Sequence, residues 1–138
     1  MASLIDTNFL LAAIFPNDPN HQKAAKAIQS LNVTDCIVPL PVLQELFYMT
    51  TVRINYGTAI DYCERIHEAG FEIQPTVGDD FNHIFEIMRQ YSSASFDFTD
   101  VAIMALAERL KITQIYTFDR RDFLIYRPTH CEYLELLP

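Results

Sequence analysis

The fold is decided by the stretch FDFTDVAIMALAERLKITQIYTFDRRDF, residues 96–123. Over residues 100–110 apolar side chains recur every three or four positions, which predicts a packed helix with one buried stripe. The stripe consists of Ile103, Leu106, Ala107 and Leu110, and the residues left for the solvent side are Glu108, Arg109 and Lys111. The β-branched and aromatic run at residues 115–118 then predicts a strand that ends at Asp119.

Acidic residues lie at the start of this helix and at the end of this strand. Asp97 and Asp100 are spaced as a cap and its partner three residues on, and capping free backbone amides is a sufficient structural reason for both. In α/β folds, catalytic and ligand-binding residues also lie at helix starts and strand ends, because both are found at the same edge of the sheet. These acids are therefore either caps or parts of a site.

The N-terminus repeats the pattern. The sequence MASLIDTN, residues 1–8, contains a minimal strand at 3–5 that runs directly into Asp6, and an apolar helix is expected over 9–15. An unpaired carboxylate at the tip of a buried strand is costly to desolvate. Two strand ends and one helix start that all carry acids indicate convergence on a cation.

The rest of the chain alternates between helices and strands. Pro19 in a first helical position, a capping box from Thr58 to Asp61, and Gly78 mark three of the helix starts. The expected helices are 19–31, 41–54, 58–69 and one from residue 78, and the expected strands are 35–40, 71–77 and 133–136. The stripe predicted to face the core in the helix from residue 78 is Phe81, Ile84, Phe85 and Met88.

This alternation predicts an α/β fold, a three-layer α/β/α sandwich with a mainly parallel central sheet. Right-handed crossovers bring the carboxyl ends of all strands to one edge. Residues 120–122 are expected to form a turn, with Asp122 as a cap or surface acid. The length of 138 residues fits one domain, residues 1–138, which would bury roughly two-thirds of the surface of its unfolded chain.

The net charge of −8 has the opposite sign to that of most nucleic-acid-binding domains. A carboxylate cluster that binds divalent cations contributes to this charge until the metal arrives, so the charge does not exclude nucleic acid. Arg120 and Arg121 form the only adjacent basic pair and directly follow Asp119. They are either a phosphate contact or a solvated pair on a short turn.

Several segments together resemble a known family. In chain order they are DTN at residues 6–8, a helical Glu45, DVAIMALAERL from Asp100, TFDRRDF at 117–123 and YRPTHCEYLELLP at 126–138. In order and spacing they are similar to those of PIN-domain ribonucleases, and most similar to the toxin subunits of bacterial and archaeal VapBC-type toxin–antitoxin pairs. The likeness spans the whole chain. It departs mildly at Val101, where the family usually has a smaller residue.

The resemblance implies which residues form the site. The catalytic and metal-binding acids it implies are Asp6, Glu45, Asp100 and Asp119, with Asp97 as an additional candidate one helical turn before Asp100. Without the resemblance, Glu45 would be interpreted as an exposed helical residue. Asn8 and Thr117 are either groups that orient the carboxylates by hydrogen bonds or ordinary turn and strand residues.

Crowded carboxylates also indicate a cofactor. They repel one another, and in an incompletely solvated cleft some stay protonated unless a cation compensates. Oxygen ligands without His or Cys favour Mg²⁺, with Mn²⁺ as a substitute. The expected chemistry is metal-dependent phosphodiester hydrolysis, and the resemblance implies endonucleolytic cleavage of RNA. Candidate RNA contacts are Arg120, Arg121, Phe9 and Tyr91.

The resemblance further implies a small antitoxin protein as partner and a homodimer. A strongly acidic surface suits a basic, flexible antitoxin tail. The apolar residues at 9–15 and 47–52 are either self-association surface or core. No membrane partner is expected, because no apolar run approaches about 20 residues and the N-terminus lacks the pattern of a signal peptide. A soluble, cytoplasmic protein is expected, with reduced thiols at Cys36, Cys63 and Cys131.

Two other classes of function compete with the nuclease. A receiver-type signalling domain also gathers acids around Mg²⁺, but it needs a phosphoacceptor Asp after a central strand and a Lys near the last strands, and neither is found at the matching places. A catalytically inactive PIN-fold interaction module would keep the fold without the chemistry. The complete set of four acids argues against the inactive module, and a measurement of nuclease activity distinguishes the two.

Overall fold

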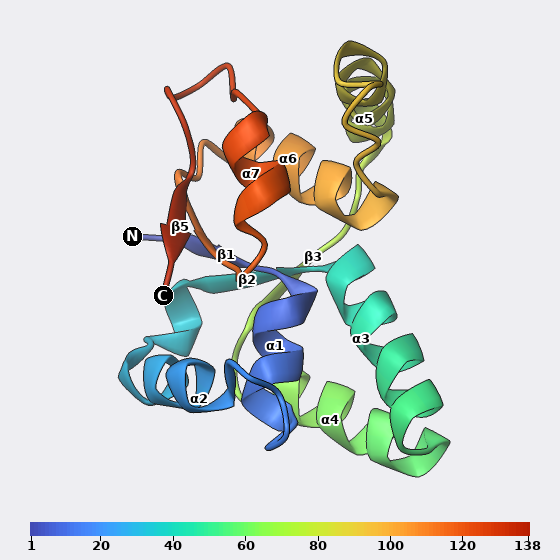
Figure 1. Cartoon of the computed structure of the whole chain (residues 1–138), viewed down its shortest axis with the longest axis vertical. Helices are drawn as coiled ribbons and strands as arrows, with labels where there is room; N and C mark the ends of the chain where they lie inside the picture. Colours follow the sequence, from blue (N-terminus) through green and yellow to red (C-terminus); the bar gives the residue numbers. More distant parts are fainter.

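Five strands form one sheet at the centre of the molecule, in the order β3-β2-β1-β4-β5 (Figure 1). The computed structural model describes residues 1–138. The strands are β1 Ser3–Ile5, β2 Cys36–Pro39, β3 Glu72–Gln74, β4 Gln114–Tyr116 and β5 Glu135–Leu137. In the central strand β1, Leu4 lies opposite Ile37 of β2 and Ile115 of β4. All four strand pairs are parallel, so the expected parallel sheet is confirmed.

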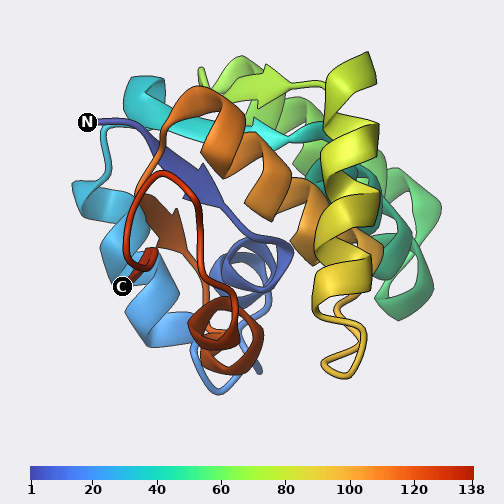
Figure 2. The ribbon, with the colours of Figure 1, turned by 90° about the horizontal axis from the view of Figure 1, so that it is seen from above.

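Helices cover both faces of this sheet, which confirms the three-layer α/β/α arrangement. In Figure 1, α1 to α4 lie on one side of the strands, and α5 to α7 lie on the other. The helices are α1 Thr7–Ile14, α2 His21–Ser30, α3 Leu40–Arg53, α4 Tyr56–Glu68, α5 Gly78–Gln90, α6 Phe98–Leu110 and α7 Arg120–Ile125, with a short 3₁₀ helix at Val33–Asp35. Seen from above, α6 runs across the sheet with α5 beside it (Figure 2).

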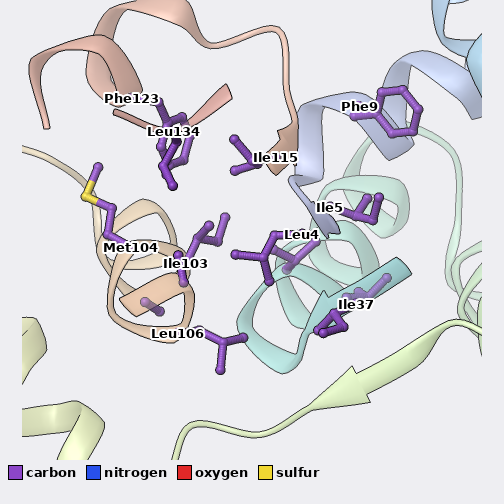
Figure 3. Close-up of a cluster of buried hydrophobic side chains, with 14 of the residues drawn as sticks. Leu4, Ile5, Phe9, Ile37, Ile103, Met104, Leu106, Ile115, Phe123 and Leu134 are labelled. Carbon is purple, nitrogen blue, oxygen red and sulfur yellow. The ribbon is translucent and has the colours of Figure 1, made fainter. Parts of the chain in front are cut away.

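The hydrophobic core lies on both faces of the sheet, and one part of it lies between α6 and the sheet. Figure 3 shows Ile103 and Leu106 of α6 pointing toward Leu4 of β1. The prediction of one buried stripe on this helix is wrong, because every residue from Asp100 to Glu108 is buried. The sheet covers one side of α6, while α5 and the segment after α7 cover others. Glu108, expected on the solvent side, is only 6% exposed.

The stripe predicted for α5 is also partly wrong. Ile84 is buried as expected, but Phe81 and Phe85 are 43% and 45% exposed. The helix lies at the margin of the molecule and packs mainly on α6 along a narrower face, which includes Asp80. The Asp80 carboxylate pairs with Arg109 of α6 at an Nε···Oδ1 distance of 2.9 Å. Spacing predicts which residues share a face, but it does not predict how wide the covered face is.

Two predicted helix starts are wrong. Pro19 lies before α2, in a turn where the Asp18 carboxylate accepts a hydrogen bond from the backbone N–H of Asn20 (2.8 Å). The helix over residues 56–68 is capped by Asn55, whose side chain accepts from the N–H of Thr58 (2.8 Å). An Asn side chain accepts hydrogen bonds from free helical amides as well as a Thr hydroxyl does. The helix therefore begins after Asn55, three residues before the predicted cap Thr58.

Near the C-terminus, the turn predicted at 120–122 is the first turn of α7, and the last strand is shifted by a residue or two, to 135–137. The predicted strand at 71–77 is present only at 72–74. The three cysteines form no disulfide, as expected. None of the helices has the length and hydrophobicity that crossing a membrane requires.

Candidate functional site

The carboxyl ends of β1 and β4 lie side by side at one edge of the sheet. The backbone N–H of Asp6 donates to the carbonyl of Tyr116 (3.0 Å), which holds the first residue after β1 against the last residue of β4. Asp6 then caps α1, and Asp119 caps α7. Neighbouring parallel strands therefore deliver two acids to the same edge.

Asp6 is the most deeply buried acid at this edge, with 3% of its surface exposed. One carboxylate oxygen, Oδ1, accepts from the backbone N–H of Thr7 (2.7 Å). The other, Oδ2, accepts from the Thr117 hydroxyl (2.7 Å) and the Asn8 amide (3.1 Å). Three donors fix the orientation of this carboxylate and leave about one of its four acceptor positions free.

Asn8 and Thr117 connect this acid to the next one. The side-chain oxygen of Asn8 accepts from the backbone N–H of Phe118 (2.9 Å), so the amide ties the start of α1 to the chain leaving β4. The Thr117 hydroxyl oxygen also accepts from the backbone N–H of Asp119 (3.0 Å). One hydroxyl thus contacts the Asp6 carboxylate and the backbone of Asp119.

The start of α6 brings a third acid to the same place. Asp97 caps this helix by accepting from the backbone N–H of Asp100 (2.8 Å), so the capping explanation holds for Asp97. Asp100 is 6% exposed, and its carboxylate accepts no hydrogen bond from the backbone. A cap explains Asp97 but leaves the burial of Asp100 without a structural reason.

Asp100, Asp119 and Asp122 form a carboxylate cluster. One oxygen from each can be chosen so that all three lie within 4.8 Å of one another. Sequence reasoning placed Asp122 in a turn and assigned it no chemistry. It reaches the cluster because residues 120–125 are helical, and the third residue of a helix lies beside its cap. The spacing of Asp119 and Asp122, which is that of a cap and its partner, is the signal that could have revealed it.

Glu45 lies apart from this cluster, in the second turn of α3. Its Oε2 atom accepts from the hydroxyl of Thr99 on α6 (3.1 Å), a residue that sequence reasoning did not single out. The charge of Glu45 is the smallest of the named causes that raise the pKa of Asp6. Glu45 and Thr99 line a cavity of about 590 Å³ together with eight other residues. The residues that complete this lining are Leu40, Pro41, Gln44, Tyr48, Pro75, Thr76, Phe81 and Phe98.

Burial and mutual repulsion raise the pKa values of these acids. Burial, opposed by the hydrogen bonds from Thr117 and Thr7, raises the pKa of Asp6 to about 7. Burial, and then the charges of Asp6, Asp97, Asp119 and Asp122, raise the pKa of Asp100 to about 9. Two charges about 4.8 Å apart repel by roughly 3 kcal/mol at an effective dielectric constant of about 20. Near neutral pH, Asp100 therefore holds a proton in the absence of a counter-charge.

This donor set fits a divalent metal ion. The side chains offer carboxylate oxygens only, which suits Mg²⁺ and Mn²⁺ better than metals that prefer imidazole or thiolate ligands. Asp100 is buried and has no basic partner. A cation bound beside it would supply the missing positive charge. No Lys or Arg is paired with Asp6, Asp100 or Asp119.

The predicted RNA contacts differ in their accessibility. Arg120 and Arg121 are exposed, and the Nη1 atom of Arg121 pairs with Oδ1 of Asp122 at 2.9 Å. Phe9 is fully buried and packs against Tyr116 and Phe118, so it is not available to a nucleic acid. Its aromatic ring belongs to the hydrophobic core.

Tyr91 is also part of the structural framework. Its ring packs against Phe96 and Tyr126, and its hydroxyl accepts from the backbone N–H of Arg127 (3.0 Å). These contacts join the end of α5 to the segment after α7. The assignment of Tyr91 as an RNA contact therefore has no support from its position.

Comparison with known proteins gives consistent results. A family model described as the PIN domain matches residues 3–127. The chain is 27% identical over 126 residues to Ribonuclease VapC26 of Mycobacterium tuberculosis, an alignment that covers 91% of this chain and 92% of the relative.

Solved structures share the fold. VapC20 of Mycobacterium tuberculosis, described as a toxin that cleaves the sarcin-ricin loop, has a TM-score of 0.79 at 18% identity, covering 87% of this chain and 92% of the other. VapBC2 from Rickettsia felis, bound to a DNA fragment from its promoter, has a TM-score of 0.70 at 17% identity, with 99% and 97% covered. At these identities the structural likeness describes the fold.

Proposed function

This chain belongs to the PIN domain family, and on that premise we propose that it is a Mg²⁺-dependent endoribonuclease, the toxin of a toxin–antitoxin pair. We take residues 1–138 as one nuclease domain. Membership in the PIN domain family removes the receiver-type alternative. The observation that carries the proposal is the gathering of Asp6, Asp100 and Asp119 at one sheet edge, with raised carboxyl pKa values and no basic partner.

The proposed roles follow from the contacts. Asp100 and Asp119 hold the cation, and Asp6 supplies a third carboxylate through its remaining acceptor position. Asn8 and Thr117 keep the Asp6 carboxylate in one orientation, and Thr117 also fixes the backbone of Asp119. When bound, Mg²⁺ would neutralise charge on the scissile phosphodiester and promote ionisation of the attacking water.

Glu45 has a different task in this proposal. The Thr99 hydroxyl donates to its carboxylate, and both residues line the 590 Å³ cavity. From there Glu45 orients the attacking water or contributes to a second cation position. Asp97 acts through the backbone, because its side chain fixes the first turn of α6 and with it the position of Asp100.

RNA is the proposed substrate because the relatives described above include a ribonuclease and a toxin that cleaves the sarcin-ricin loop. Arg120 and Arg121 directly follow the cap Asp119 and are exposed, which supports a role for them in binding a phosphate beside the metal. Their positions support phosphate binding, although Arg121 also neutralises Asp122 in the free protein.

The proposed partner is a small antitoxin with a basic segment, as the VapBC complex among the structural relatives suggests. The net charge of −8 favours such a segment. A homodimer is proposed as well. Residues 9–12 belong to the core, so of the two predicted apolar segments only that of α3 offers surface for association, together with the start of α4. Its exposed members are Tyr48, Val52, Ile54 and Tyr56. We place the protein in the cytoplasm, where its RNA substrates are.

The test is cleavage of total cellular RNA by the purified protein with Mg²⁺. Asp6→Asn and Asp119→Asn each remove one charge from the site, while Asp61→Asn removes one exposed charge from α4 and serves as the matched control. We expect defined fragments with the wild type and Asp61→Asn, and none with the site variants or in excess EDTA. Equal cleavage by all four proteins would reveal a contaminating nuclease and refute the assignment. A wild-type protein without activity would favour the non-catalytic interaction module.

A further inference from the structure

We propose that the cavity lined by Glu45 and Thr99 is a nucleobase subsite, in which an unpaired base beside the cleaved phosphodiester stacks on Phe81 and Phe98. This inference rests on the proposed function for RNA as the substrate. It adds to that function the part of the RNA that the protein recognises, which is the exposed base of a single-stranded segment. The two rings take no part in the carboxylate site.

The lining of the cavity suits a base better than a phosphate. Three aromatic side chains line it, Tyr48, Phe81 and Phe98, and all three are exposed. Glu45 is the only charged residue among the ten that form the lining, which contains no Lys or Arg. This carboxylate would repel a phosphate, whereas unpaired bases stack on aromatic side chains in single-stranded RNA sites.

Two neutral polar side chains can contact the edge of the base. Gln44 of α3 and Thr76, in the segment between β3 and α5, line the cavity, and neither side chain hydrogen-bonds within the chain. An amide offers both a donor and an acceptor, as the edge of a base does. The volume of about 590 Å³ lies in the range of small-ligand sites, so the cavity has room for a base with its ribose.

The cavity adjoins the carboxylate site. The Thr99 hydroxyl donates to Oε2 of Glu45 (3.1 Å), and Thr99 directly precedes Asp100 in the first turn of α6. Phe98 is the first residue of the same helix. A base that stacks on Phe98 is therefore attached to a ribose and phosphate close to the acids proposed to bind the cation.

Buried polar contacts fix the wall of the cavity that carries Phe81. The neighbouring residue Asp80 is buried, and its carboxylate accepts from the backbone N–H of Val77 (3.0 Å) and from Nε of Arg109 (2.9 Å). Arg109 also donates to the carbonyl of Pro75 (3.4 Å). These contacts tie α5 and the segment before it to α6, the helix that carries the other ring. Binding to a wall that is already fixed costs little ordering entropy.

Variants of the two rings test the subsite. Phe81→Ala and Phe98→Ala each remove one ring, while Phe98→Tyr keeps it. Phe85→Ala is the matched control, because Phe85 of α5 is 45% exposed, as Phe98 is, but does not line the cavity.

The readout is fluorescence anisotropy in excess EDTA at low salt, which measures binding without cleavage. One probe is a labelled single-stranded RNA of about 12 nucleotides and mixed sequence, a length within the range of single-strand binding sites. The other is a chain of the same length that carries ribose and phosphate but no bases. Both probes have the same charge, so the difference between their Kd values reports contacts with the bases.

We expect the wild type to bind the RNA more tightly than the abasic chain. Phe81→Ala and Phe98→Ala should each raise the Kd for the RNA at least about fivefold, the lower end of what loss of a stacking partner costs, and leave the Kd for the abasic chain unchanged. Phe98→Tyr should restore most of the affinity that Phe98→Ala loses. Phe85→Ala should bind both probes as the wild type does.

Equal affinity of the wild type for the two probes overturns the inference, and so does a loss of affinity in Phe85→Ala that matches the loss in the cavity variants. A cavity variant that loses RNA affinity and also elutes later in gel filtration overturns it as well, because a second copy of the chain then covers the rings. If these results accompany cleavage of RNA by the wild type with Mg²⁺, only the subsite is refuted. Absence of cleavage by the wild type refutes the proposed function itself.

Discussion

Raising the pH from 6 to 8 should strengthen cation binding by about two orders of magnitude. The pKa of Asp100 is raised to about 9, so this carboxyl group is protonated across the range. A metal ligand must be deprotonated, and the incoming cation therefore displaces that proton. Release of one proton lowers the apparent Kd by about tenfold for each pH unit. The pKa of Asp6, about 7, adds a smaller contribution in the lower half of the range.

Isothermal titration at pH 7 in two buffers with different ionisation enthalpies measures the proton release directly. We expect about one proton to leave for each cation bound to the wild type. Asp100→Asn should bind more weakly and with a clearly shallower dependence on pH, because the group that releases the proton is gone. A Kd that is independent of pH, with no proton released, would show that Asp100 is already ionised and that the electrostatic description of the site is wrong.

Three further predictions follow from the same contacts. Without metal, the contribution of the Asp6 and Asp100 carboxyl groups to stability should be greatest below about pH 4 and should be lost as the pH rises through about 7 and 9, because the folded state binds these protons more tightly than the unfolded chain. Mg²⁺ should reduce this loss, and the difference in Tm between wild type and Asp100→Asn, recorded against pH, tests both. Thr117→Val should weaken Mn²⁺ binding by about 10- to 100-fold while Thr113→Val has little effect, because only Thr117 contacts both the Asp6 carboxylate and the N–H of Asp119; equal titration curves would contradict this. Glu108→Ala should lower the free energy of unfolding in urea by about 2 kcal/mol, since it removes the hydrogen bonds that Thr129 and His83 donate to this carboxylate, and an unchanged midpoint would refute it.

The general position of the site could be predicted from the sequence. Asp6 and Asp119 directly follow short β-branched or apolar runs, and parallel strands bring such residues to one edge. Asp97 and Asp100 carry the spacing of a cap and its partner, and the structure contains that cap. Glu45 could not be placed by periodicity, because nothing local distinguishes it from an exposed helical glutamate; its contact with Thr99 arises from packing between α3 and α6.

The residues that sequence reasoning missed owe their positions to packing between distant segments. The spacing of apolar residues predicts that Glu108 lies on the solvent side of α6. It is buried because residues 127–133 fold back over this helix. Burial would raise its pKa, but hydrogen bonds from Thr129 and His83 outweigh this and lower the pKa to about 2. Phe81 and Phe85 belong to an apolar stripe, yet they are exposed because α5 packs mainly on α6 and this packing leaves them uncovered. Local patterns describe a face, and the tertiary fold determines whether that face is covered.

The most direct test of the central claim, that acids from separate segments form one divalent-cation site, is an anomalous difference map from crystals soaked in Mn²⁺. The account predicts a peak within coordination distance of the carboxylate oxygens of Asp100 and Asp119, on the side toward Asp6. The peak should be lost in crystals of the Asp119→Asn variant. A map without a peak between these carboxylates at saturating Mn²⁺, or with its strongest peak elsewhere on the molecule, would contradict the account.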